Sequence, residues 1–309
     1  MTDASRIPAF VNRGSGSFEK ARDALASSGR FDLHEVEPSK LESEIKQAVA
    51  AGAKRILIAG GDGSICAAAQ VVSGSDVELA IIPGGTLNHF ASDHGIPLDP
   101  DEAVKVATGA KTTTVDVGFA GERVFLNTSS IGAYVTFVRM RDRLEQRFGY
   151  RLASLIAMSR ILAILPTVNV DLDVEGDVKH YRTPLVFIGV GERELKLPLL
   201  GNRVKNGKQG LHIFVVRSRK RARLLVIAFE AVARGVKTVR REPELDAYLV
   251  NGCVAADLRR GMATIAFDGE TAVMETPLSY RIERDALKIV IPENVDEGEV
   301  KAAEAHPAS

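Results

Sequence analysis

Two glycine-rich segments lie close together early in the chain, and both have the composition of a phosphate-binding turn. Residues 60–64 have the sequence GGDGS and residues 83–86 the sequence PGGT; each follows a short apolar run, at 56–59 and 79–82. Glycine after a strand permits a positive φ and close approach to a ligand, and the N–H groups at the start of a following helix attract anions. We expect the pair to cradle a polyphosphate, although an ordinary strand-end turn explains GGDG alone equally well.

The two segments do not match the common nucleotide motifs. No Gly-Lys-Ser/Thr follows the first turn, so it is not a P-loop, and no glycine follows Gly63 where a dinucleotide fingerprint needs one. GGDGS followed by PGGTLNHFA (residues 83–91) instead resembles the diacylglycerol kinase catalytic family, whose bacterial lipid kinases and sphingosine kinases carry GGDGT and then PxGTxNDFA. NAD kinases share the first motif and lack the second in that form.

Composition is compatible with such an enzyme. The chain has 309 residues, of which 45% are hydrophobic and 26% charged, enough for two domains with their own cores. The 40 basic and 40 acidic residues cancel, which argues against a nucleic-acid-binding protein. Cys66 and Cys253 form neither a disulfide framework nor a metal cluster, which favours a reducing, cytoplasmic location. We expect no signal peptide, and no membrane span because Ser154, Ser159 and Arg160 interrupt the apolar stretch 152–165.

The alternation of elements predicts two domains. Residues 1–118, joined by about 279–292 as the chain end returns, are expected to form a doubly wound parallel-sheet (Rossmann-like) domain. Its predicted strands are 7–11, 31–36, 56–59 and 79–82, and its predicted helices are 18–28, 41–51 and 101–108, with a further helix-like segment after each glycine-rich turn. Residues 119–278 are expected to form a mostly antiparallel β-sandwich, and 293–309 a disordered acidic tail. The strands predicted in this second domain are 124–129, 168–174, 181–190, 211–217, 263–268 and 272–276.

The turns after the first-domain strands all fall at the carboxyl edge of the predicted sheet, where such folds bind ligands. Residues 12–16 (NRGSG) resemble the family's NPxSG loop, with Arg13 and Gly14 in place of proline. The nucleotide-contacting positions that the resemblance implies are Asn12, Gly14, Gly60, Gly61, Asp62, Gly63, Ser64, Gly84, Gly85, Thr86 and Asn88.

For several of these side chains a structural role is an alternative. Asp62 is expected to face the phosphates or their Mg²⁺, or else to stabilise its own turn by accepting backbone N–H groups. Ser64 and Thr86 can donate to phosphate or cap helices, and Asn88 can bond the nucleotide or hold its loop. Asp116 matches a family aspartate of the metal and water network.

A further carboxylate lies in the second domain. Residues 268–270 (DGE) follow a predicted strand and match the family's DGE motif, whose glutamate is the general base. Asp-Gly is also the commonest hairpin turn, which is the ordinary interpretation of the motif. The resemblance thus implies Glu270, Asp62 and Asp116 as catalytic residues, the two aspartates also meeting the metal of Mg-ATP.

Three positions depart from the family pattern. Ala67 and His89 stand where relatives carry carboxylates, and Gln209 stands where some bacterial members bind a structural Mg²⁺ through an aspartate. Histidine is a poor Mg²⁺ ligand, so Asp93 or water takes its place or the metal lies elsewhere. For His89 we favour a half-buried structural role over proton transfer.

Two basic segments could meet an anionic membrane. Residues 217–223 (RSRKRAR) precede an apolar, amphipathic stretch at 224–239, and a second cluster covers 139–151. Each cation near an anionic surface contributes about 1 kcal/mol, so reversible peripheral binding at the inner membrane face and an ordinary solvated surface are equally good interpretations. A homodimer is the assembly that we keep open.

These observations lead to one expected function and two alternatives. We expect an ATP-dependent, Mg²⁺-requiring lipid kinase that transfers the γ-phosphate to a hydroxyl of diacylglycerol or a related lipid. One alternative is an NAD kinase, which shares GGDG and the two-domain plan. The other is a nucleotide-binding regulator with weakened activity, consistent with the lost carboxylates.

Overall fold

The structure is a computed structural model that describes residues 6–195, 200–204, 207–217, 245–251, 254–258 and 261–293. The chain divides into unit 1, Met1–Val117 with Glu283–Ala302, and unit 2, Gly118–Ile282 with Ala303–Ser309. Strands β5 (Thr112–Ala120) and β18 (Leu278–Val290) each contain residues of both units. Three features of the sequence lie outside the described residues: the basic and apolar segment 218–239, Cys253, and the tail from residue 294.

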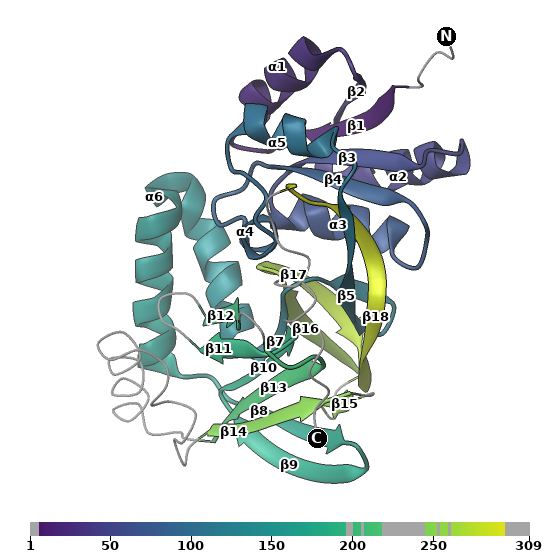
Figure 1. Cartoon of the computed structure of the whole chain (residues 1–309). Helices are drawn as coiled ribbons and strands as arrows, with labels where there is room; N and C mark the ends of the chain where they lie inside the picture. Colours follow the sequence, from purple (N-terminus) through teal and green to yellow (C-terminus); the bar gives the residue numbers. More distant parts are fainter. Residues whose placement is uncertain are drawn as a thin grey trace. The chain divides into compact units, whose positions relative to one another are not determined.

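Unit 1 is built on a parallel sheet with helices on both faces (Figure 1). Its strand order is β2-β1-β3-β4-β18, and each neighbouring pair is parallel. The strands are β1 (Ile7–Asn12), β2 (Phe31–Val36), β3 (Arg55–Gly60), β4 (Glu78–Pro83) and the end of β18. The helices are α1 (Phe18–Ser28), the 3-10 helix η1 (Pro38–Lys40), α2 (Leu41–Ala50), α3 (Asp62–Val72), α4 (His89–Asp93) and α5 (Pro100–Ala107). The predicted doubly wound domain is confirmed.

The apolar runs of unit 1 are buried because both faces of the sheet are covered. In β3, Leu57 and Ala59 join one core cluster with Leu25 of α1 and Val104 of α5, and Ile58 is buried as well. Parallel strands end at the same edge of a sheet, so the turns after β1, β3 and β4 lie together there.

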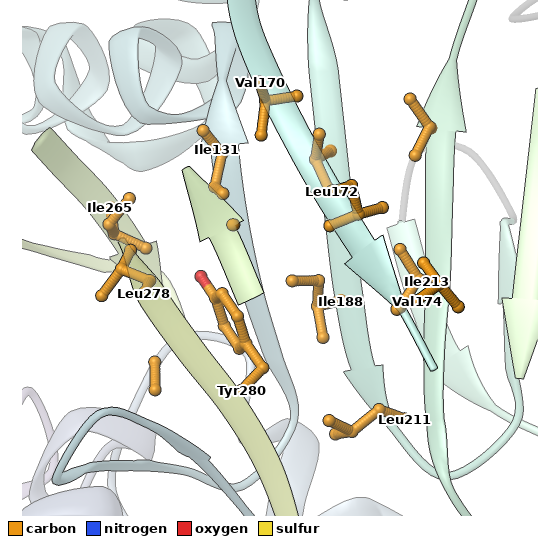
Figure 2. Packing of buried hydrophobic residues seen from close by; sticks show 14 of the residues in the cluster. Ile131, Val170, Leu172, Val174, Ile188, Leu211, Ile213, Ile265, Leu278 and Tyr280 are labelled. Carbon is orange, nitrogen blue, oxygen red and sulfur yellow. The ribbon is translucent and has the colours of Figure 1, made fainter. Parts of the chain in front are cut away.

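Unit 2 is a sandwich of two antiparallel layers. One layer has the order β14-β13-β10-β7-β16-β17, and the other contains β9-β8-β15 and the start of β18. Inward side chains of both layers, among them Ile131, Ile188, Leu172 and Tyr280, form one core cluster (Figure 2). The strands are β6 (Arg123–Phe125), β7 (Thr128–Gly132), β8 (Val168–Val174), β9 (Asp177–Thr183), β10 (Leu185–Val190), β11 (Arg193–Leu195), β12 (Leu200–Arg203), β13 (Leu211–Val216), β14 (Leu245–Val250), β15 (Val254–Asp257), β16 (Met262–Phe267) and β17 (Glu270–Glu275). The predicted β-sandwich is confirmed.

Two strands predicted in unit 2 are wrong in their extent. The predicted strand 181–190 is the end of β9 and all of β10, which are separated at Pro184, a residue without a backbone N–H for a ladder. The predicted strand 124–129 is the end of β6 and the start of β7. Its interruption falls at residues 126 and 127, whose backbone N–H groups, like that of the next residue, donate to a side chain from elsewhere in the chain.

The largest difference from the prediction is a helix. α6 (Ala133–Ile164) has 32 residues and follows β7 directly. It breaks at Gly149, where φ is 69° and ψ 163°, and turns back on itself (Figure 1). We call residues 133–148 its first arm and residues 150–164 its second arm. α6 contacts β7, β16 and β17, and Val135 and Val138 of its first arm pack against Ala266 of β16. In the described part of the chain, no helix combines the length and apolarity needed to cross a bilayer.

Candidate functional site

Three loops at the carboxyl ends of β1, β3 and β4 are joined by hydrogen bonds. The Gly84 N–H donates to the Gly60 carbonyl at 2.8 Å, and the Ser15 hydroxyl donates to the Gly84 carbonyl at 2.8 Å. The Asn12 amide Nδ2 donates to Ser64 Oγ at 2.7 Å. We call residues 12–17, 60–64 and 83–90 the turn cluster. The structure therefore brings together the first-domain loops that the sequence assigned to the nucleotide.

The glycines of the turn cluster are required by the packing of one turn on another. A Cβ on Gly85 would lie 2.8 Å from the Gly61 Cα, a distance that real Cβ atoms do not show, and a tight 3.0 Å from Asn88 Oδ1. A Cβ on Gly60 would lie 2.5 Å from Ser64 Oγ. Glycines 60, 61, 63, 84 and 85 all have ordinary negative or extended φ, so the expectation of positive φ was wrong. Close approach between the two backbones, rather than a left-handed conformation, explains their identity.

Asp62 connects the two glycine turns. Its Oδ2 accepts the N–H of His89 and its Oδ1 the N–H of Phe90, both at 3.1 Å. These are the first N–H groups of α4, which a helix leaves without internal partners. The carboxylate therefore serves the neighbouring turn, whereas we had expected its own turn or the phosphates. Each oxygen keeps a second lone pair for another donor or a cation.

The amide side chains of the cluster also hold backbone. Asn88 has φ of 50°, and its side chain both accepts the Gly85 N–H at 2.7 Å and donates to the Gly85 carbonyl at 2.8 Å. Asn12 Oδ1 accepts the Gly14 N–H at 2.8 Å. Of the two roles considered for Asn88, the structure shows it holding its loop.

Two predicted capping roles are wrong. The N-cap of α3 is Gly61 and that of α4 is Asn88, and neither makes a side-chain capping bond. Ser64 instead lies within the first turn of α3, buried against Gly60, and Thr86 is exposed in the loop before α4.

The groups that the turn cluster offers a ligand are backbone N–H groups. The first hydrogen bond of α3 runs from the Ile65 N–H to the Gly61 carbonyl, so the N–H groups just before residue 65 have no partner inside the helix. They carry the positive end of the helix dipole, which favours a phosphate group.

Asp116 lies apart from these contacts, on β5. It is 2% exposed, and its Oδ1 accepts the N–H of Asp285 on β18 at 3.0 Å. Thr114, on the same strand, donates its hydroxyl to Asp285 Oδ1 at 2.5 Å. The structure thus shows Asp116 linking β5 to β18 within unit 1, and its predicted metal role stays a prediction.

In unit 2, the DGE segment is the hairpin turn between β16 and β17, so the ordinary interpretation of Asp-Gly is correct. Asp268, at φ 46°, accepts three N–H groups: Leu126 at 2.7 Å, Asn127 at 2.9 Å and Thr128 at 2.7 Å. Its own N–H donates to the Thr128 carbonyl at 2.8 Å. This carboxylate is the side chain that interrupts the predicted strand 124–129.

The hairpin is also held from α6, by a residue that sequence patterns alone did not single out. Arg141 is 9% exposed, and its Nη2 donates to the Gly269 carbonyl at 3.1 Å and to Asp142 Oδ1 at 2.7 Å. Its guanidinium lies 5.4 Å from the centre of the Tyr150 ring. The one signal in the sequence was that Arg141 belongs to the basic cluster 139–151.

Glu270 is the next residue after this fixed turn and begins β17. It is exposed, and within the described part of the chain its carboxylate makes no hydrogen bond or ion pair. The turn is therefore anchored by Asp268 and Arg141 while the glutamate side chain stays available.

The described residues contain no group of three or more His, Cys, Asp or Glu side chains arranged to hold a metal ion. Of the positions that depart from the family pattern, His89 and Gln209 are half-buried. A cavity of about 580 Å³ in unit 1 lies at the other ends of β1 and β3, lined by Ile7, His34, Lys54 and Arg55 among others, and is separate from the turn cluster.

Comparisons with known proteins show similarity over the part of the chain that contains the turn cluster. Residues 8–120 match the model of the diacylglycerol kinase catalytic domain. A "Probable lipid kinase YegS-like" of Pseudomonas putida is 33% identical over 151 residues, which cover 48% of this chain and 50% of that protein. A "Diacylglycerol kinase" of Mycobacterium tuberculosis is 40% identical over 72 residues, or 23% of each chain. The alignments thus span half or less of these two relatives.

The similarity in fold covers more of the chain than the sequence alignments do. A crystal structure of a diacylglycerol kinase from Bacillus anthracis has a TM-score of 0.67 at 21% identity, covering 94% of this chain and 98% of that one. The family match contains the loops after β1, β3 and β4, whose contacts make up the turn cluster. Over residues 8–120, the chain is similar to the diacylglycerol kinase catalytic domain.

Proposed function

We propose that the chain is an ATP-dependent lipid kinase, which transfers the γ-phosphate of ATP to a hydroxyl group of diacylglycerol or a related lipid. The observation that carries the proposal is the construction of the turn cluster. Its glycines pack on each other and its polar side chains Asn12, Asp62 and Asn88 hold backbone, so the surface left for a ligand is the N–H groups at the start of α3. Such a surface suits a polyphosphate.

Mg²⁺ enters this proposal with the nucleotide. Kinase Mg²⁺ ions are held largely by phosphate oxygens and water, with one or two carboxylates from the protein. Asp62 fits this requirement, because each of its oxygens accepts one N–H and keeps a lone pair. The ion would neutralise the charge that develops on the transferred phosphoryl group.

Glu270 is the proposed general base. A base must reach the acceptor hydroxyl and must not be engaged elsewhere. Glu270 meets the second condition, and its turn is fixed by Asp268 from one side and by Arg141 from the other. We assign Asp268 and Arg141 to positioning the turn, with no contact to the reacting atoms.

The relatives' names and the exposed basic residues support a proposal for the acceptor and the site of action. We propose a lipid acceptor met at an anionic membrane, with the enzyme bound peripherally and reversibly at the cytoplasmic face. NAD is the main competing acceptor, because NAD kinases share GGDG.

The test is transfer of labelled γ-phosphate from ATP and Mg²⁺, with mixed micelles of diacylglycerol offered in one reaction and NAD in another. We expect label in the organic phase only. Label on NAD would move the chain to the NAD kinases. Binding of ATP without label on either acceptor would contradict the kinase proposal and favour a regulator.

A further inference from the structure

The second arm of α6 exposes large apolar side chains where a helix in water normally exposes polar ones. Leu152 is 47% exposed and Leu155 68% exposed. Within the described chain, four of the nine exposed large apolar residues lie on α6: these two, Phe148 just before the break and Ile164 at the end. Scattered exposed apolar residues need no explanation, but a concentration on one helix does.

The sizes of the side chains on this arm are reversed relative to an ordinary amphipathic helix. Its buried residues, Ala153, Ala157 and Ile161, follow each other at intervals of four, so they share one face. That face is mostly alanine. Leu152 and Leu155, three residues apart, lie together on the opposite side, which we call the leucine face. The arm thus packs with small side chains and presents larger ones outward.

The charges beside the leucine face have a single sign. Residues 150–164 contain Arg151 and Arg160 and no acidic residue, and both arginines are exposed. At 100° per residue they fall on either side of the leucine face. Exposed apolar residues flanked by arginine are complementary to a surface that is apolar inside and anionic outside.

A bilayer with anionic lipids has that composition. A second copy of this chain fits less well, because a symmetric contact would bring the same arginines together. We propose that the second arm of α6 is the membrane-docking surface of the chain. It lies on an anionic bilayer with Leu152 and Leu155 inserted and Arg151 and Arg160 at the headgroups. This inference rests on the proposed function, since it assigns the surface by which the kinase would reach its lipid.

The absence of tryptophan from the sequence makes a direct test available. Leu155→Trp places one fluorophore on the leucine face, and Val178→Trp places one on β9, where the native side chain is 53% exposed in the same unit. Each full-length variant is mixed with vesicles of phosphatidylglycerol and phosphatidylcholine, or of phosphatidylcholine alone, without ATP or diacylglycerol. We expect a blue shift, and quenching by brominated lipid, for Leu155→Trp on anionic vesicles only.

The second measurement is vesicle sedimentation of the Leu152→Gln/Leu155→Gln double variant, with Val178→Gln as the matched control. Both variants change exposed side chains only, so we expect them to fold, and circular dichroism checks that they do. We expect at least a tenfold loss of binding for the double variant and less than a twofold change for the control. Similar binding by the two would overturn the inference. So would a vesicle-independent blue shift that grows with protein concentration, because it would assign the face to a second copy.

Turnover of a short-chain, water-soluble diacylglycerol separates this inference from the proposed function. Full turnover in the double variant, with binding lost, supports docking by this arm. Docking with no turnover by the unmodified chain would contradict the kinase proposal alone. Turnover without docking would contradict this inference alone.

Discussion

Each unit contains an Asp-Gly pair after a strand, and the two aspartates use their carboxylates in the same way. Asp62 in unit 1 accepts two N–H groups at the start of α4, both at 3.1 Å. Asp268 in unit 2 accepts three N–H groups between β6 and β7, at 2.7 to 2.9 Å. In both cases the partner segment is distant in sequence, so each aspartate fixes a loop that its own strand does not reach.

The two sites differ in the element that the chain enters after the aspartate. After Asp62 the chain enters α3, and the groups left for a ligand are backbone N–H groups. After Asp268 the chain enters β17, and the group left is the exposed carboxylate of Glu270. One unit therefore presents donors suited to phosphate, and the other presents an acceptor suited to a hydroxyl proton. The shared chemistry of Asp-Gly is structural in both.

The largest expected effect on stability is that of Asp268→Ala. It removes three short bonds to a carboxylate, each worth about 1.5 kcal/mol, so the free energy of unfolding should fall by about 4.5 kcal/mol. Urea unfolding measures the total loss of stability. Amide hydrogen exchange should become faster within residues 123–132. Unchanged exchange in that segment would contradict the structural role of Asp268.

The second largest expected effect is a loss of stability of unit 2 at acidic pH. Burial lowers the pKa of His212 to about 4, and its Nδ1 accepts the Arg193 N–H at 2.9 Å. Between pH 6.5 and 4 the unfolded chain binds a proton that the folded chain refuses, so stability present above pH 6.5 is lost as pH falls, by on the order of 3 kcal/mol.

The comparison is with His212→Gln, unfolded by urea at a series of pH values. Its stability should fall less steeply than that of the unmodified chain over the same range. If the free energies of unfolding of the two proteins fell in parallel as the pH decreased, the lowered pKa of His212 would be contradicted.

Asp62→Ala should cost less than Asp268→Ala, about 2 kcal/mol, because it removes two longer bonds. Amide hydrogen exchange should become faster in the segment around α4 and should not change in unit 2. A stability equal to that of the unmodified chain, together with lost ATP binding, would instead assign Asp62 to the phosphates or their metal alone.

Gly85→Ala has the smallest expected effect on stability, about 2 kcal/mol or less, from overlap with Gly61 and Asn88. Its effect on function should be larger, because separating the turns displaces the N–H groups of α3. The control is Gly261→Ala, outside the turn cluster, where a Cβ would meet nothing within 4 Å. Calorimetry with ATP should show weakened binding for Gly85→Ala only; equal affinities would refute the turn-to-turn contact as the basis of the site.

The parts of the fold that could be predicted are those with local signals. Most strands and helices of unit 1, among them β1 to β4, were found from apolar runs and glycine turns, and the edge where the turns meet follows from parallel strand direction. Several strands of unit 2, such as β8, were found from period-two alternation, whereas β14 and β15 were not predicted. The exposed position of Glu270 after a turn also agrees with a DGE hairpin.

The remaining features depend on contacts that sequence spacing does not reveal. Asp62 meets residues 89 and 90, and Asp268 meets residues 126–128, so their partners were not predicted. We explained the glycines of the turn cluster by a positive φ, whereas the structure explains them by the close approach of a second backbone segment. α6 was missed because its second arm buries alanine and exposes leucine, which removes the usual amphipathic pattern.

The central claim is that Glu270, and not the aspartates that hold the turns, supplies the reacting carboxylate. The measurement is single-turnover transfer of labelled γ-phosphate by Glu270→Gln, after urea unfolding has shown that this exposed substitution leaves stability unchanged. We predict a rate about 10³-fold below that of the unmodified chain, with ATP affinity retained, as expected for loss of a general base. A rate within threefold of the unmodified chain would contradict the account.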